Sequence, residues 1–287
     1  MGRLVDIGDT ALYVEERGQS DAFPLLVFHG GPGLDHHMFG GYLDPLTDDG
    51  RYRLVLVDER SQGQSPKTDP STWTIEQMAH DVTALANALH VSDNYATLGH
   101  SYGAFVVLQH AVDHPGEPKG TIVSAGIASA RWFDNVADEL ERFEPVSLRK
   151  QVADSWAAEA TVQTEDEAAR ILGDQMPFHF RDPTGPLIDD YVRNVPGGRF
   201  SPDVLRHFAT QDYGGIDLVD RLAEVAHPTL VLAGRYDRAC PVGAGEEMAK
   251  LLPAAELVIF EESAHMMFVE ENERYLTVVR QFLARFV

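Results

Sequence analysis

Short apolar runs alternate along this chain with longer stretches in which apolar residues recur every three or four positions. Short apolar runs bounded by turn residues are typical of buried strands, whereas the longer spacing is typical of amphipathic helices. The sequence therefore predicts buried strands at residues 25–28, 54–57, 95–98, 121–124, 229–233 and 257–260.

Helices are predicted between these strands. One begins after Thr74, where Thr74 and Gln77 form a candidate capping box, and others cover residues 104–112 and 218–225. Residues 4–13, with a turn at Gly8 and Asp9, predict an opening hairpin. Such alternation of strands and helices predicts an α/β fold: a mostly parallel central sheet with helices on both faces.

The alternation lapses between residues 130 and 211, a segment rich in acidic residues, aromatic residues and prolines. We interpret residues 130–211 as a mostly helical cap inserted into a core formed by residues 1–129 and 212–287. Most of its aromatic side chains are expected to pack the cap against the core.

Composition narrows the class of protein. The 287 residues include 23 Lys and Arg against 45 Asp and Glu, a net charge of −22. That charge would repel nucleic acid and anionic membrane surfaces, so neither is expected as a partner. No apolar run reaches the roughly 20 residues that cross a bilayer. The N-terminus lacks the apolar stretch of a signal peptide, and Cys240 is the only cysteine. We therefore expect a cytoplasmic protein; the oligomeric state is open.

The most informative motif is Gly99-His100-Ser101-Tyr102-Gly103, a G-x-S-x-G sequence between a predicted strand and a predicted helix. Small residues on either side of the serine suit a sharp turn that holds the hydroxyl clear of the sheet. Taken alone, the motif could be a plain Gly/Ser turn. Whether Ser101 is catalytic therefore depends on whether an acidic residue and a histidine occur at the expected places further along the chain.

Those partners follow in the chain order Ser, Asp, His that this turn requires. Asp237 comes just after the strand at 229–233, and His265 follows the strand at 257–260. Taken singly, Asp237 could be a turn residue and His265 one of twelve ordinary histidines. Because parallel strands bring their carboxyl ends to one edge, the two are expected to meet Ser101 there.

A serine hydroxyl is a weak nucleophile, so an imidazole must take its proton and return it to the leaving group. His265 is the candidate base, and Asp237 would orient its ring. The backbone N–H groups of Tyr102 and Gly31 are the candidate oxyanion donors, Gly31 lying in the loop His29-Gly30-Gly31-Pro32-Gly33 after an early strand.

Three segments carry a family resemblance. They are the His29–Gly33 loop, the run Asp58-Glu59-Arg60-Ser61-Gln62-Gly63-Gln64-Ser65, and Gly234-Arg235-Tyr236-Asp237-Arg238-Ala239-Cys240-Pro241. Together they make the chain similar to α/β-hydrolases of the proline iminopeptidase type. The resemblance covers residues 1 to about 130 and about 212 to 287. It implies the α/β-hydrolase fold, the catalytic set Ser101, Asp237 and His265, and substrate-pocket positions near His29, Gly30, Arg238 and Cys240.

The sequence also departs from that family. Members more often carry G-G-S-W-G-S at the nucleophile, whereas the form found here is also common in esterases and lactonases. One branch places a glutamate after the catalytic aspartate, where this chain has Arg238. Members bind a substrate amine with glutamates that come largely from the cap. Candidates for that role are the acidic runs at 138–141 and 165–167.

The sequence thus predicts a serine hydrolase that needs no metal or cofactor and acts on a small molecule or short peptide. The leading activity is release of N-terminal proline or another small residue from short peptides or amides. The first alternative is a carboxylesterase or lactonase on small acyl substrates. The second is a non-catalytic receptor on the same fold.

Overall fold

The computed structural model describes residues 2–287, which build an eight-stranded sheet in the order β1-β2-β4-β3-β5-β6-β7-β8. The first two strands form the predicted hairpin, with Asp6 opposite Ala11, and β2 runs antiparallel to β4. All other neighbouring strands are parallel. The strands are β1 Gly2–Asp6, β2 Ala11–Arg17, β3 Phe23–Phe28, β4 Tyr52–Asp58, β5 Ala96–His100, β6 Gly120–Ser124, β7 Thr229–Gly234 and β8 Ala255–Phe260.

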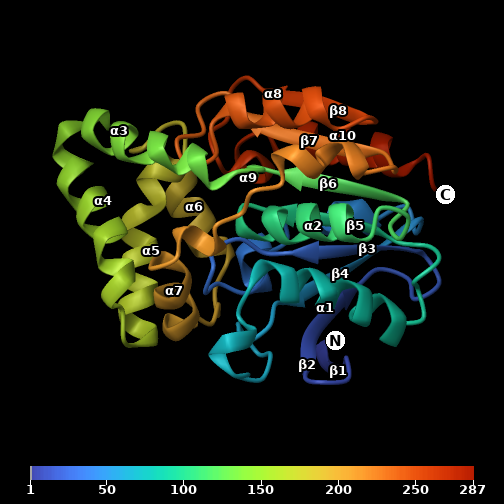
Figure 1. Ribbon diagram of the computed structural model, residues 1–287. Helices are drawn as coiled ribbons and strands as arrows, with labels where there is room; N and C mark the ends of the chain where they lie inside the picture. Colours follow the sequence, from blue (N-terminus) through green and yellow to red (C-terminus); the bar gives the residue numbers. More distant parts are fainter. Residues whose placement is uncertain (1) are drawn as a thin grey trace.

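Helices cover both faces of this sheet, as predicted (Figure 1). Along β3, Leu26 and Phe28 belong to the core under α1 Ile75–Ala88, α2 Tyr102–Asp113 and α8 Val242–Leu251. Leu25 and Val27 belong to the opposite core, under α10 Asn272–Leu283 and the short helices η1 His36–Phe39 and η2 Asp44–Thr47. This alternation follows from the two-residue period of a strand. Because both faces of the sheet carry apolar residues, both faces are buried under helices.

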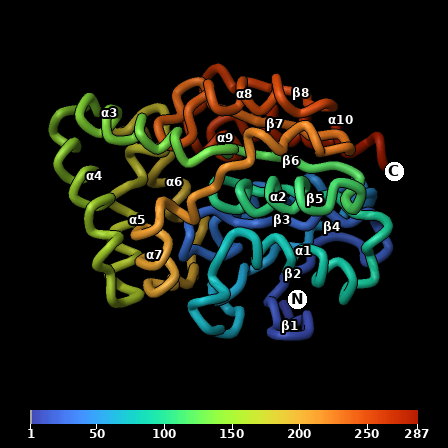
Figure 2. The backbone as a smooth tube through the Cα atoms, viewed as in Figure 1, coloured from blue at the N-terminus to red at the C-terminus, as the bar shows by residue number. Residues whose placement is uncertain are grey.

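Residues between β6 and β7 form a separate group of helices at one end of the sheet (Figures 1 and 2). The group comprises α3 Asp134–Arg142, α4 Val146–Ala158, α5 Glu165–His179, α6 Pro186–Asn194 and α7 Pro202–Ala209. Because β6 and β7 are paired neighbours, the chain leaves and re-enters the sheet at adjacent strands. Val136, Phe143, Val152 and Phe178 of this group pack with Ala239 from the loop after β7, which joins the group to the sheet.

Two local predictions were wrong in detail. The segment predicted as a helix at 218–225 is the 3-10 helix η7 Val219–Glu224, a short turn before His227 and Pro228. The residue before a proline favours extended backbone, so the segment cannot continue as a helix into β7. At Thr74 only half of the capping box forms: the Thr74 hydroxyl accepts the Gln77 N–H, whereas the Gln77 side-chain amide donates to Asp81.

The packing of α2 on β3 predicts that Gly103 tolerates no side chain. A Cβ there would lie 2.5 Å from the carbonyl oxygens of Phe28 and His29. We expect Gly103→Ala to lower the free energy of unfolding by at least about 2 kcal/mol, although alanine is the better helix former. Gly116→Ala is the control, since a Cβ at Gly116 meets nothing within 4 Å. Equal urea midpoints for the two variants would contradict this packing argument.

Candidate active site

Ser101 lies at the turn between β5 and α2, with φ 55° and ψ −118°. Positive φ is unusual for serine and persists only where the surroundings enforce it. Here the turn is so tight that a Cβ at Gly99 would lie 2.0 Å from the carbonyl oxygen of Gly103. The two glycines therefore permit the close approach that the G-x-S-x-G motif predicts, and the Ser101 N–H anchors the turn by donating to Ser124 at 2.9 Å.

Asp237 and His265 meet at the same edge of the sheet. Asp237 Oδ2 and His265 Nδ1 are 2.8 Å apart, and both side chains are buried. The other carboxylate oxygen accepts the N–H groups of Ala239 and Cys240, each at 2.9 Å, which fixes Asp237 in the loop after β7. Because the carboxylate accepts hydrogen bonds only, it places the ring proton on Nδ1 and leaves Nε2 as an acceptor.

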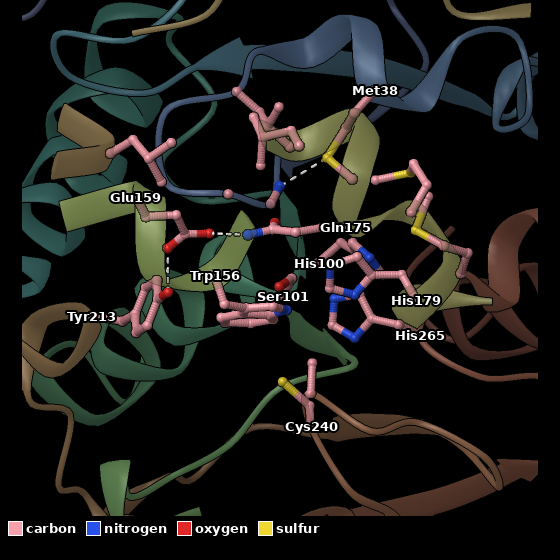
Figure 3. A pocket seen from close by; sticks show the side chains of 18 of the residues that line it. Met38, His100, Ser101, Trp156, Glu159, Gln175, His179, Tyr213, Cys240 and His265 are labelled. Carbon is pink, nitrogen blue, oxygen red and sulfur yellow. Dashed lines mark hydrogen bonds between the residues drawn. The ribbon is translucent and has the colours of Figure 1, made fainter. Parts of the chain in front are cut away.

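Ser101 and His265 line one cavity of about 80 Å³, together with Gly30 and Gly31 (Figure 3). Within residues 2–287 no direct hydrogen bond joins Ser101 to His265. Hydrogen bonds of this kind are often long in unliganded sites and tighten around a substrate. The arrangement thus brings the three residues that the sequence singled out to one place.

The glycine loop after β3 approaches the serine closely. A Cβ at Gly30 would lie 3.1 Å from that of Ser101, and Gly31 has φ 121°, a conformation that suits glycine. The loop is held by Gln62, whose Oε1 accepts the Gly33 N–H. The other predicted oxyanion donor, Tyr102, is the first residue of α2, directly after Ser101. Its side chain is buried and its hydroxyl donates to the Met78 sulfur, and Tyr102 is not among the residues that line the cavity.

Two predicted pocket residues do not line this cavity, and these predictions were wrong. His29 is buried below the loop, where its ring binds the Gly30 carbonyl at 2.8 Å and the Glu59 N–H at 3.3 Å. Arg238 donates to the carbonyls of Phe178 and Phe180, so its guanidinium ties the loop after β7 to the end of α5. Gly30 and Cys240 do line the cavity.

The acidic runs proposed for amine binding are also misplaced. Residues 138–141 and 165–167 do not contribute to the cavity lining, and most of their acidic side chains are exposed. The carboxylate that does line the cavity is Glu159, at the end of α4. It is 3% exposed, and the Gln175 amide and the Tyr213 hydroxyl both donate to it.

Burial raises the pKa of Glu159 to about 7, although the hydrogen bonds from Gln175 and Tyr213 lower it again in part. Glu159 is therefore poised to take up or lose a proton near neutral pH. No local motif marks it in the sequence, because Gln175 and Tyr213 reach it from 16 and 54 residues further along the chain.

Two further histidines flank His265. The rings of His100 and His179 each lie 4.9 Å from the His265 ring, measured between centroids. Burial lowers the pKa of both well below the ordinary value, so they remain neutral. The His179 carbonyl also accepts the His265 N–H at 3.0 Å. The end of α5 thus helps to set the position of the His265 ring.

Two groups of side chains have potential metal ligands within 4.8 Å of one another: Asp237 with Cys240 and His265, and Asp35 with His36 and His37. In the first group, Asp237 already accepts three hydrogen bonds, and burial raises the pKa of the Cys240 thiol, which disfavours a thiolate. In the second, Asp35 binds the His37 ring and the backbone of His37 and Arg199. In both groups the aspartate carboxylate is already bonded to a histidine ring and to backbone N–H groups.

Comparison with known proteins shows the family to which the chain belongs. A family described as the alpha/beta hydrolase fold matches residues 24–272, and the chain belongs to this family. It is 29% identical over 281 residues to the proline iminopeptidase of Lactiplantibacillus plantarum, covering 93% of each chain. It is 27% identical to that of Clostridium botulinum, covering 91% of this chain and 89% of the relative. The family and these relatives identify a hydrolase.

Solved structures share the fold. A hydrolase from Bacillus anthracis str. Sterne aligns with a TM-score of 0.80 at 22% identity, over 100% of this chain and 99% of that one. The proline iminopeptidase of Mycobacterium smegmatis gives 0.76 at 23% identity, over 100% and 98%. An esterase from Exiguobacterium antarcticum gives 0.74 at 22% identity, over 99% and 100%. Among residues 2–287 we find no helix with the length and apolar character of a membrane span.

The raised pKa of Glu159 predicts a pH-dependent cost in stability. The folded protein holds this proton more tightly than the unfolded chain, whose ordinary glutamate pKa is 4.5, so stability falls as the pH rises from about 4.5 to about 7. Glu159→Gln removes the charge. At pH 8 we expect its free energy of unfolding, measured by urea titration, to exceed that of the wild type by on the order of 2–3 kcal/mol. The difference should vanish near pH 4.5.

Glu141→Gln is the matched control, because Glu141 is an exposed residue of the same group of helices. A Glu159→Gln variant whose stability difference from wild type stays constant between pH 4.5 and 8 would show that Glu159 is not desolvated in the folded protein.

Proposed function

We propose that this protein is a serine hydrolase that forms an acyl-enzyme and releases N-terminal proline, or another small residue, from short peptides or amides. Ser101 is the nucleophile in this proposal. His265 accepts its proton through Nε2 and then returns it to the leaving amine, while Asp237 holds the ring in the required tautomer. The N–H groups of Gly31 and Tyr102 stabilise the oxyanion.

The observation that carries the substrate assignment is the buried carboxylate of Glu159 in the cavity that contains Ser101. A protonated amine removed from water is costly unless an opposite charge meets it. Glu159 supplies that charge, and a bound ammonium group in turn favours its ionised form. Tyr213 and Gln175 hold the carboxylate in place, and Figure 3 shows the hydrogen bond that each makes with Glu159.

Residues 130–211 act as a lid over the core in this account. They contribute Trp156, Glu159, Gln175 and His179 to the cavity, whereas Ser101 and His265 come from the core. A substrate would therefore be enclosed between the two parts, with its amine against the lid and its scissile carbonyl against the core. We place the enzyme in the cytoplasm, which suits a chain with a single cysteine.

A carboxylesterase or lactonase is the second candidate. Apart from Glu159 and Gln175, the part of the lid and core around Ser101 is largely apolar, with Phe105, Phe133 and Leu205 among the lining side chains. Such a lining suits an uncharged acyl group, and Glu159 with a pKa of about 7 is neutral in part of the molecules. The esterase from Exiguobacterium antarcticum shares the fold and gives this reading further support.

Substitution of Glu159 separates the two candidates. We expect Glu159→Gln to reduce kcat/KM for proline p-nitroanilide by at least about tenfold, mainly through KM, because the substrate amine loses its counter-charge. Turnover of the uncharged ester p-nitrophenyl acetate should stay within about threefold of wild type. Glu141→Gln should leave both activities unchanged, and Ser101→Ala should abolish both.

The same assay includes N-acetylproline p-nitroanilide, which has no amine to protonate. Cleavage of this blocked substrate as readily as the free amine, or an unchanged KM in Glu159→Gln, would remove the aminopeptidase assignment. The esterase assignment would then stand in its place.

A further inference from the structure

A second cavity, of about 190 Å³, adjoins the one at Ser101. Leu34, Met38, Leu172, Met176 and Tyr191 line both cavities, so these five side chains form a wall that the two cavities share. The far wall of the second cavity is formed by α5, α6 and the segment before α7, and includes Ala169, Gly173, Val192 and Phe200. Neither the proposed nucleophile nor Glu159 lines it.

The residues that line both cavities, among them Met38, indicate where the second cavity lies relative to Ser101. Glu159 and Tyr213 lie on one side of Ser101, whereas His265 and Met38 lie on the other (Figure 3). If the substrate amine binds Glu159, the acyl part of the substrate lies on the side of Ser101 where Glu159 and Tyr213 are. The leaving group must then extend past His265, toward the wall that contains Met38 and Met176.

The chemistry of the second cavity favours an apolar group. Its buried carboxylate, Asp35, already accepts the backbone N–H groups of His37 and Arg199 and binds the His37 ring at 2.9 Å. Three hydrogen bonds thus satisfy both oxygens of Asp35, and the other charged or titratable residues of the lining, His37 and Arg199, are at least partly exposed. The shared wall is built from leucine, methionine and tyrosine, and methionine side chains adapt to apolar groups of different shape.

We propose that this second cavity is the leaving-group subsite and that it selects an apolar residue directly after the scissile bond. The proposal rests on the proposed function, since the amine at Glu159 fixes the direction of the substrate. The substrate class is then a small N-terminal residue, as in the proposed function, followed by an apolar one.

The test compares three substrates that share the prolyl group: proline amide, prolyl-glycine amide and prolyl-leucine amide. For the wild type we expect kcat/KM to rise by at least about tenfold from the glycine to the leucine compound, because the leucine side chain is buried. Gly173→Leu should narrow the cavity, because Gly173 lines it and a Cβ there meets nothing within 4 Å. Ala169→Leu narrows it from another position on α5.

We expect both variants to lose the preference for leucine while proline amide turnover stays within about twofold of wild type. Gly173→Ala is the matched control and should keep the preference, since it adds one methyl group. Equal kcat/KM for the three substrates in the wild type would overturn the proposal. So would a loss of proline amide turnover in the narrowed variants that equals the loss for prolyl-leucine amide.

Failure of the aminopeptidase assignment gives a different result. In that case none of the three prolyl amides is cleaved, while p-nitrophenyl acetate still is. If the narrowed variants then discriminate among esters by the length of the acyl chain rather than by the alcohol, the second cavity holds the acyl group, and the leaving-group assignment is wrong.

Discussion

The strained turn at Ser101 is the constraint on which the rest of the site depends. Positive φ at a serine costs free energy, and the fold supports it by packing Gly99 against Gly103 and Gly103 against the end of β3. The same packing brings the Gly30–Gly31 loop beside the serine. These close contacts between backbone segments set the positions of the hydroxyl, the first turn of α2 and the glycine loop relative to one another.

A second constraint is the carboxylate of Glu159, buried where the helices α3–α7 meet the sheet. An isolated charge there is unfavourable, and this cost of burial is what raises the pKa of Glu159. Tyr213 and Gln175 reduce the cost without removing it. In the proposed function the ionised, buried carboxylate binds the substrate. The positive charge of the substrate amine offsets the cost of removing the Glu159 carboxylate from water, and no such charge is present in the unliganded site. Stability and amine recognition are therefore opposed at this residue.

Much of the fold and the residues at the sheet edge could be predicted from sequence. Buried strands have short apolar runs, and parallel strands end at one edge, so Ser101, Asp237 and His265 could be placed together without coordinates. Glu159 could not, because its environment is created by Gln175 and Tyr213, which reach it only through the packing of the helices on the core. His29 and Arg238 were misassigned for a related reason. Sequence proximity to a site does not reveal that a side chain is already hydrogen-bonded to backbone carbonyls.

The central claim is that Ser101 carries a covalent acyl group during turnover. It is tested most directly by rapid acid quenching of the enzyme with a prolyl ester, followed by intact-mass and peptide analysis. The account predicts a mass increase of one prolyl group on the peptide that contains Ser101, and no increase in Ser101→Ala. Turnover without any adduct, or an adduct on the peptide that contains Cys240, would contradict it.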